Sequence, residues 1–163
     1  FEKIHNIAIE LVYTDTSSNS SIIGMSESEE AAAQEELKSD NVFLEKFQGD
    51  GLLIATSFGS AAYNLSFGGS VIYNTFHTLQ ITPIAPLNSK VYRSLSNSVI
   101  IPDNMLIRLV PKRNSGNIII TIDGDNNFYE GVEKIETVIN KTVKVIRLKD
   151  YNFIRKVNDK FLK

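Results

Sequence analysis

The sequence predicts a mainly β domain of stacked sheets, arranged like a β-sandwich, with a few short helices. Two observations indicate this fold. Short apolar runs rich in isoleucine and valine, which strands favour, recur along the chain. Turn-forming pairs such as Asp-Gly separate these runs, as expected for many short strands joined by tight turns. Because 163 residues suit one domain, we expect residues 1–163 to form a single β domain.

The first predicted element is a strand over residues 7–13. Its apolar side chains occupy every second position and so share one face: Ile7, Ile9, Leu11 and Tyr13. A polar stretch follows, and Ser26 with Glu29 three residues later is typical of a helix start, which predicts a helix near 27–38. Leu37 is the only large apolar residue of that helix. We therefore expect residues 15–40 to form a surface insert made of a loop and a helix.

The sequence changes character beyond residue 41, where strands are predicted at successive apolar runs. These runs are 42–47, 52–56, 71–73, 98–101, 107–110, 118–122, 134–139 and 143–148. The expected turns are Asp50-Gly51, Asp103-Asn104, Ser115-Gly116 and Asp123-Gly124. The tail places Phe153, Ile154, Val157 and Phe161 at helical spacing, which predicts a closing helix whose apolar stripe packs onto the sheets.

Composition excludes several classes of function. The net charge of −2 does not suit a nucleic-acid binder, and the absence of cysteine excludes disulfides and thiolate chemistry. With two histidines we expect no metal site held by the protein. No apolar run is long enough to span a bilayer, and no signal peptide is visible, so we expect a cytoplasmic protein without a membrane partner. The chain begins at Phe1, and we expect it to be part of a longer protein.

Charge is unevenly distributed along the chain. Residues 27–40 are acidic and residues 141–163 are basic. The two segments read as solvated faces of opposite sign, which would be complementary across an oligomer contact. The basic segment could alternatively bind a phosphate or polyphosphate.

One segment, residues 49–69, carries the chemistry. It reads as a turn, a buried strand, a bend of small residues and a short helix that starts at Ser60 and ends at Gly68-Gly69. Small residues at 59–62 let a ligand approach the backbone, and a helix start offers N–H groups to phosphate or ribose oxygens. Asp50 supplies a carboxylate in a turn that can accept hydrogen bonds from ribose hydroxyls or an amide. Tyr63 supplies a flat ring and a hydroxyl.

This segment resembles the second conserved block of the NAD kinases, which reads approximately G-D-G-L-x-x-x-T-P-T-G-S-T-A-Y-N-x-S-x-G-G. The matching residues are Gly49-Asp50-Gly51-Leu52, Thr56, Gly59-Ser60, Ala62-Tyr63-Asn64, Ser66 and Gly68-Gly69. Two later stretches also look like family motifs, 81–86 with 91–93 and 120–124. The likeness covers residues 41–163.

The resemblance implies the C-terminal domain of an enzyme that phosphorylates the 2′-hydroxyl of the adenosine ribose of NAD. The phosphoryl donor would be ATP or polyphosphate with Mg²⁺. It implies that Asp50 faces the nicotinamide ribose and carboxamide, and that Ala62, Tyr63 and Ser66 line the pocket near adenine. It also implies that Asp123 approaches the reacting ribose. The remaining implied NAD-binding residues are Ala61, Ala85 and Tyr92. The family builds this site across subunits, so we expect a homo-oligomer, a dimer or tetramer.

The sequence also departs from the family pattern. Thr56-Ser57-Phe58 stands for T-P-T, and Ala61 stands where a threonine is usual, which could weaken binding about threefold to tenfold. The catalytic G-G-D-G motif is absent. We therefore assign no catalytic residue, expect an N-terminal α/β domain outside this chain to carry that motif, and expect the chain alone to make no NADP.

The family's Asn-Glu pair, which holds the adenosine ribose, is also missing. Either Glu10 aligns with its glutamate while Ile9 replaces the asparagine, or the polar helix near 27–38 replaces the hairpin that carries the pair. These departures motivate an alternative, a non-catalytic nucleotide-binding or assembly module derived from the family. Lipid kinases of the diacylglycerol type share a related plan but lack the signature from Gly59-Ser60 to Tyr63.

Overall fold

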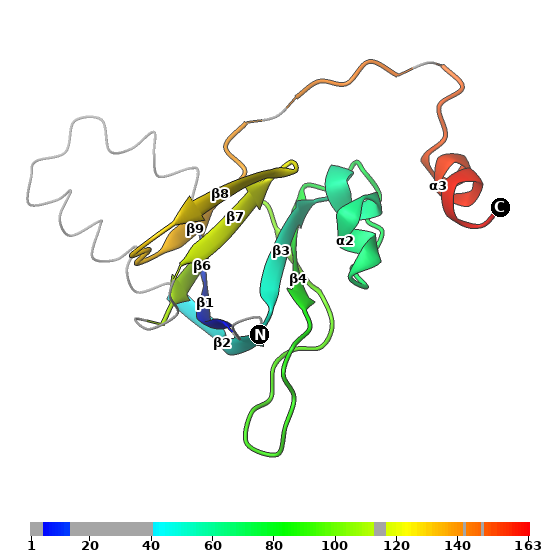
Figure 1. Ribbon diagram of the computed structural model, residues 1–163. Coiled ribbons are helices and arrows are strands. Elements are labelled where there is room, and N and C mark those ends of the chain that lie inside the picture. Colours follow the sequence, from blue (N-terminus) through cyan, green and yellow to red (C-terminus); the bar gives the residue numbers. More distant parts are fainter. Residues whose placement is uncertain (1–4, 14–40, 113–116, 142, 148) are drawn as a thin grey trace, which may run out of the picture. The chain divides into compact units, whose positions relative to one another are not determined.

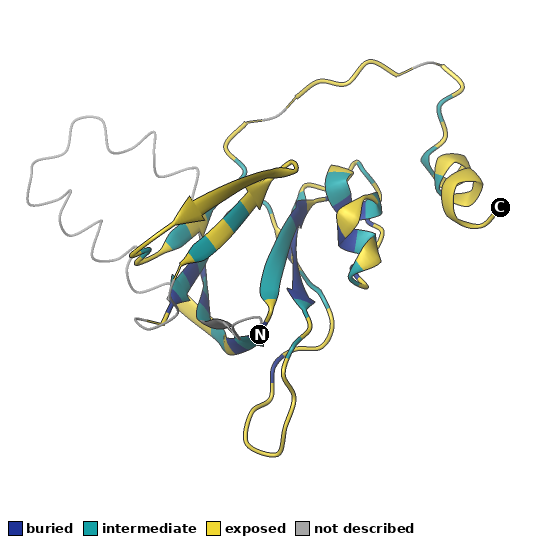
Figure 2. Ribbon diagram, viewed as in Figure 1, coloured by how far each residue is buried: buried dark blue, intermediate teal, exposed yellow. Residues whose placement is uncertain are grey.

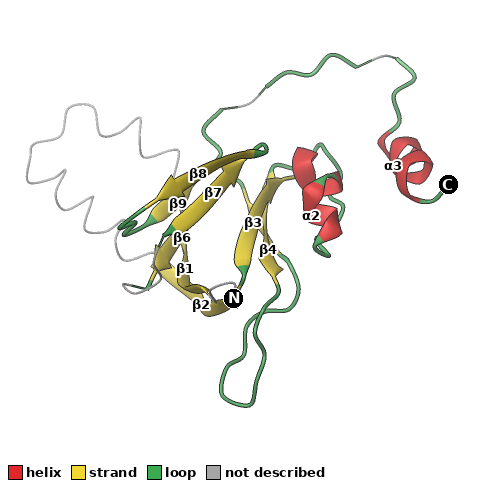
Figure 3. Ribbon diagram, viewed as in Figure 1, coloured by secondary structure: helices red, strands yellow, loops and turns green. Residues whose placement is uncertain are grey.

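The computed structural model describes residues 5–13, 41–112, 117–141, 143–147 and 149–163 (Figure 1). The helix predicted near 27–38, the insert at 15–40 and the Ser115-Gly116 turn lie outside these residues. Within them the fold is mainly β, with several sheets and few helices, which confirms the predicted fold class (Figure 3). The chain divides into two compact units. The first unit contains residues 1–51, 85–95 and 104–138, and the second contains residues 52–84, 96–103 and 139–163.

The first unit contains an antiparallel sheet with strand order β2-β1-β6-β9. Its strands are β1 (His5–Tyr13), β2 (Asn41–Gly49), β6 (Met105–Pro111) and β9 (Ile135–Thr137). Side chains of β6 alternate between buried and half-buried, as expected for a strand with one face in a core. Ile9 pairs with Leu109 and Leu11 with Ile107, and all four side chains are buried. These pairs form the centre of the core of this unit.

The same unit contains a two-stranded hairpin, β7 (Ile118–Ile122) and β8 (Asp125–Tyr129). The predicted Asp123-Gly124 turn joins the strands, with φ of 50° at Asp123 and 97° at Gly124. Positive φ at both central residues is typical of the tight turns that match the twist of a hairpin. Figure 2 shows β8 exposed along its whole length.

The second unit contains a three-stranded sheet with order β3-β4-β5. Its strands are β3 (Gly51–Thr56), β4 (Thr78–Ile84) and β5 (Val99–Pro102). Successive side chains of a strand point to opposite faces, and β4 is buried on both faces (Figure 2). Leu79 and Ile81 lie on one face, and the polar residues Gln80 and Thr82 lie on the other. Asn64, in the segment 49–69, contacts this buried polar face of β4.

Three helical segments complete the second unit: η2 (Phe58–Ala61), α2 (Tyr63–Ser66) and α3 (Phe153–Phe161). The α3 helix confirms the predicted closing helix, and the Asn152 side chain caps it by accepting a hydrogen bond from the Arg155 N–H at 2.9 Å. Phe153 makes an edge-on contact with Tyr73, with ring centroids 4.9 Å apart. No residue of α3 is buried, however, so its apolar stripe is not covered in the way that the sequence predicted. Among the described residues, none of the helices is long and apolar enough to cross a membrane.

Two predicted strands are wrong. Residues 71–73 are irregular, because the backbone N–H of Ile72 donates to the Ser60 hydroxyl at 2.9 Å instead of to a neighbouring strand. Residues 143–147 are also irregular and exposed, with Ile146 98% exposed. Conversely, the strands predicted from apolar runs did not include β4 or β8. Polar residues and Pro83 interrupt β4, and β8 begins Asp125-Asn126-Asn127.

Candidate functional site

The motif segment folds into two short helical turns rather than the single helix predicted to start at Ser60. The first turn, η2, begins directly after Thr56 ends β3, and the Gly59 N–H donates to the Thr56 hydroxyl at 3.3 Å. The Ser60 hydroxyl donates to the Ser57 carbonyl oxygen at 2.7 Å and is fully buried. The backbone leaves helical geometry at Ala62, with φ −109° and ψ −134°, before α2 begins. This break turns Ala62 and Tyr63 outward as a pair.

Four predicted NAD-binding residues lie together on this segment. Ala61 is half-buried, and Ala62, Tyr63 and Ser66 are exposed. The Tyr63 ring is 68% exposed and contacts Phe67 edge-on, with centroids 4.9 Å apart. An exposed ring beside small side chains offers a planar surface on which an aromatic base can stack, and the Tyr63 and Ser66 hydroxyls can make hydrogen bonds.

The predicted end of this helix is confirmed at the Gly-Gly pair. The Gly68 N–H donates to the Leu65 carbonyl oxygen at 3.1 Å, and the Gly69 N–H donates to the Asn64 carbonyl oxygen at 3.0 Å. Gly68 has φ 78°, the left-handed conformation in which glycine commonly ends helices. The two glycines thus end the helical segment that carries the exposed residues Ala62, Tyr63 and Ser66.

Two residues of this region were not among the predicted site residues. Asn64 is almost completely buried beneath the exposed surface, and its spacing of four from Ser60 was the available signal. Lys160 of α3 donates from Nζ to the Ala61 carbonyl oxygen at 3.2 Å, so the basic tail brings a positive charge to the motif. The basic composition of residues 141–163 gave no indication of this contact.

The other predicted site residues belong to the first unit. Asp50 is exposed at the bend after β2. Residues 85–95 form a loop anchored along the same strand, because the Leu87 N–H donates to the Gln48 carbonyl oxygen at 2.7 Å. Asp50 follows Gln48 by two residues, and Ala85 precedes Leu87 by two residues.

Ala85 has an unusual backbone conformation. Its φ of 44° lies in the left-handed region, which costs an L-residue with a Cβ roughly 1–2 kcal/mol. The next residue is Pro86. No hairpin turn accounts for this conformation, and backbone strain of this kind clusters at functional sites. The role of Ala85 as a ligand contact stays a prediction.

Tyr92 and Asp123 are both exposed. Tyr92 lies in a tight turn of the 85–95 loop, in which the Ser89 N–H donates to the Tyr92 carbonyl oxygen at 2.8 Å and the Tyr92 N–H donates to the Ser89 hydroxyl at 3.1 Å. Asp123 lies at the tip of the β7–β8 hairpin, where its positive φ is what the turn requires. The turn fully accounts for an aspartate at position 123.

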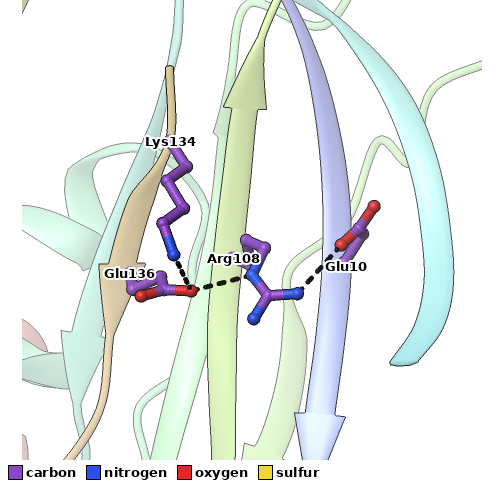
Figure 4. A network of polar contacts seen from close by, with 4 residues as sticks. All are labelled: Glu10, Arg108, Lys134 and Glu136. Carbon is purple, nitrogen blue, oxygen red and sulfur yellow. Dashed lines mark hydrogen bonds and ion pairs between the residues drawn. The ribbon is translucent and has the colours of Figure 1, made fainter. Parts of the chain in front are cut away.

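Glu10, a possible counterpart of the family glutamate, takes part in a network of ion pairs (Figure 4). Arg108 Nη1 lies 3.5 Å from Glu10 Oε2, and Arg108 Nε donates to Glu136 Oε1 at 2.8 Å. Lys134 Nζ lies 3.2 Å from the same Glu136 oxygen. Arg108 is the direct cross-strand neighbour of both Glu10 and Glu136, so the network joins β1, β6 and β9.

This network shifts two pKa values. The hydrogen bond from Arg108, followed by that from Lys134, lowers the pKa of Glu136. The hydrogen bond to Glu136 raises the pKa of Arg108. Glu10 therefore takes part in an ion-pair network that links neighbouring strands of the sheet.

A resident metal site was not predicted. Among the described residues, no group of three or more histidine, cysteine, aspartate or glutamate side chains is arranged to hold a metal ion. His77 and Asp103 form an exposed pair, with Nδ1 and Oδ2 3.5 Å apart. Two groups alone do not make up a ligand set for a tightly held ion.

Comparisons with known proteins point to the same family as the motif at residues 49–69. The family described as the ATP-NAD kinase C-terminal domain matches residues 19–148. The chain is 43% identical over 125 residues to an NAD kinase of Streptococcus agalactiae serotype Ia, covering 76% of this chain and 45% of that protein. It is 38% identical over 128 residues to an NAD kinase of Finegoldia magna, covering 76% and 46%. The chain therefore spans about half the length of these curated relatives.

Two solved structures share the fold. A yeast NADH kinase complexed with NADH superposes with a TM-score of 0.63 and 22% identity over 99% of this chain and 38% of that chain. An NAD kinase from Archaeoglobus fulgidus in complex with ATP gives a TM-score of 0.53 and 19% identity over 82% of this chain and 39% of that chain. At these identities the likeness concerns the fold alone. With the family match over most of its length, the chain belongs to the ATP-NAD kinase family and contains its C-terminal domain.

Proposed function

We propose that this chain is the NAD-binding domain of an NAD kinase, which transfers a phosphoryl group to the 2′-hydroxyl of the adenosine ribose of NAD and so makes NADP. The observation that carries the proposal is the exposed surface of Ala62, Tyr63 and Ser66 on an anchored helical turn. The names of the relatives, and the ATP and NADH bound in the two structural neighbours, support it. Residues 1–163 act as one domain in this proposal.

The proposed NAD-binding residues are those that the family resemblance implies. Ala61, Ala62, Tyr63 and Ser66 contact the adenine side of NAD. Asp50 accepts hydrogen bonds from the nicotinamide ribose or carboxamide, and the remaining contacts come from Ala85, Tyr92 and Asp123. Phosphoryl transfer depends on positioning and charge neutralisation more than on covalent help from the protein. The task of this domain is therefore to hold NAD in a fixed orientation.

The residues assigned above bind NAD, and none of them is assigned to the phosphoryl donor or its metal. ATP or polyphosphate enters with Mg²⁺ as the metal-bound co-substrate, and no residue of this chain is assigned to the ion. The G-G-D-G motif, whose aspartate is thought to activate the ribose hydroxyl in the family, is absent from the 163 residues. We therefore propose that the 163-residue chain binds NAD but makes no NADP alone.

Self-association is a further part of this proposal. The β7–β8 hairpin exposes large apolar side chains, and an isolated two-stranded hairpin is only marginally stable. These side chains are Ile119, Ile122, Phe128 and Tyr129. Covering them in a homo-oligomer would stabilise the hairpin. Light scattering should give a multiple of the chain mass, and Phe128→Asp should lower it; a monomer at all concentrations would contradict this part.

The second candidate is a non-catalytic nucleotide-binding or assembly module. It is favoured by the missing G-G-D-G motif and by Ala61 in place of threonine. An assay for NADP formation by the natural full-length protein, with NAD, ATP and Mg²⁺, separates the two. Steady formation of NADP supports the kinase, whereas NAD binding without any NADP supports the module. Absence of both NAD binding and NADP formation would refute both proposals.

A further inference from the structure

The exposed NAD-binding surface rests on a buried polar layer. Ser60 and Asn64 lie four residues apart on the inner side of η2–α2, and both are at most 1% exposed. Facing them, Gln80 and Thr82 on the polar face of β4 are equally buried. Buried polar side chains lower stability unless each finds partners. The contacts of Asn64 show how they are satisfied here.

Asn64 joins two elements through its side-chain amide. Its Nδ2 donates to the Ser60 carbonyl oxygen at 3.1 Å and lies 2.8 Å from the side-chain amide of Gln80. Its Oδ1 accepts a hydrogen bond from the Thr82 hydroxyl at 2.6 Å. The nitrogen of the amide thus contacts both the first helical turn and β4, and the oxygen contacts β4.

The layer continues on both sides of Asn64. The other end of the Gln80 amide lies 2.6 Å from the hydroxyl oxygen of Ser98, next to the start of β5. On the opposite side, Gly69 lies so close to Asn64 that a Cβ at this position would overlap the side-chain amide. The amide therefore has little freedom to take another orientation.

This arrangement has a consequence for Tyr63. The residue is bonded directly to Asn64 and follows the backbone break at Ala62. Hydrogen bonds are directional, and bonds at both ends of the Asn64 amide restrict how the turn can be oriented on β4. The backbone from which the Tyr63 ring projects is therefore restricted as well.

We propose that Asn64, held by Thr82 and Gln80, is a positioning residue for NAD. It fixes the orientation in which Ala62, Tyr63 and Ser66 meet the dinucleotide, without touching it. The proposal rests on the proposed function, because it assigns the NAD-binding surface to those residues. It predicts that loss of one buried hydrogen bond weakens NAD binding even when the protein remains folded.

A matched pair of variants at Thr82 tests this directly. Thr82→Val keeps the shape of the side chain and removes the hydroxyl that donates to Asn64. Thr82→Ser keeps the hydroxyl and removes a buried methyl group. Asn64→Leu removes the whole amide, and Ile107→Val, in the core of the first unit, controls for a general loss of stability. NAD is titrated into each variant of the full-length protein by calorimetry, at a temperature at which circular dichroism shows all of them folded.

We expect Thr82→Val and Asn64→Leu to raise the Kd for NAD by about tenfold or more. Thr82→Ser should stay within about threefold of the unchanged protein, and Ile107→Val should show the unchanged Kd. Equal Kd values for Thr82→Val and Thr82→Ser would overturn the positioning role while leaving the proposed function intact. Should the unchanged protein bind no NAD, the proposed function itself fails, and this inference fails with it. If Asn64→Leu does not fold, the comparison of the two Thr82 variants decides alone.

Discussion

The side-chain amide of Asn64 fills the space in which any residue other than glycine would place its Cβ at position 69. The Gly69 N–H also donates to the Asn64 carbonyl oxygen at 3.0 Å, so both the backbone and the side chain of Asn64 meet this glycine. Gly68, one residue earlier, has φ 78° but open space around it. The two glycines of the motif are therefore required for different physical reasons.

Substitution by alanine should separate these reasons. Gly69→Ala forces the buried amide to move and should lower the free energy of unfolding by about 1–3 kcal/mol, as overpacking of a core does. Gly68→Ala introduces only backbone strain, about 1 kcal/mol. Urea denaturation measures both. A Gly69→Ala variant no less stable than Gly68→Ala would show that the Asn64 amide does not occupy this space.

The Arg108–Glu136 pair predicts a pH dependence of stability. Arg108 lowers the pKa of Glu136 below its ordinary value of 4.5 in the folded protein. The ionised form is thus favoured by folding, so the stabilisation is complete above about pH 4.5 and is lost as the pH falls through the lower folded-state pKa. Because both side chains are partly exposed, the contribution is at most about 1 kcal/mol.

Glu136→Gln should therefore lower the free energy of unfolding at pH 7 and have progressively less effect below pH 4.5. Urea denaturation at a series of pH values measures the difference from the unchanged protein. Glu133→Gln, at an exposed carboxylate outside the network, is the matched control. A difference for Glu136→Gln that stays constant from pH 7 to pH 3 would contradict the role assigned to the pair.

Ala85→Gly should raise the free energy of unfolding of the protein. At φ 44° glycine avoids the strain of a Cβ, although the greater freedom of glycine in the unfolded state offsets part of the gain. The expected net change is a stabilisation of up to about 1 kcal/mol. Ala55→Gly, at the buried position of β3 and without a positive φ, should have the opposite sign. Destabilisation of both variants by similar amounts in urea would exclude a strained backbone at Ala85.

Asp50→Ala should raise the KM for NAD more than tenfold in the natural full-length protein and leave the KM for ATP unchanged. The reason is that the proposal assigns the Asp50 carboxylate to NAD alone. Asp125→Ala, which removes an exposed carboxylate of β8, serves as the control and should change neither constant. An unchanged KM for NAD in Asp50→Ala would remove this residue from the site.

Sequence patterns predicted the elements whose hydrogen bonds lie within sheets and whose apolar residues are continuous. The strand at 7–13 is an example, since alternation alone placed Ile9 and Leu11 on the buried face. They did not predict β4, because one of its two buried faces is polar and the partners of that face come from distant residues. They also misread residues 71–73, because Ile72 bonds to a side-chain hydroxyl twelve residues away. Long-range polar contacts of this kind leave no periodic signal.

The candidate site was predictable to a similar extent. The motif correctly indicated a short helical segment that ends at Gly68-Gly69. The break at Ala62 was not predictable, because the run of small residues at 59–62 carries no signal for where helical geometry stops. The supporting role of Asn64 was not predictable either, since its partners Gln80 and Thr82 are 16 and 18 residues away.

The most direct test of the proposed NAD-binding surface is a calorimetric titration of NAD into the protein and into two variants, Tyr63→Ala and Phe76→Ala. Both remove an exposed aromatic ring from the second unit, but only Tyr63 belongs to the motif. We expect saturable binding by the unchanged protein, weakened about tenfold or more by Tyr63→Ala through loss of base stacking and unaffected by Phe76→Ala. Absence of saturable binding, or the same affinity for both variants, would contradict the proposed NAD-binding surface.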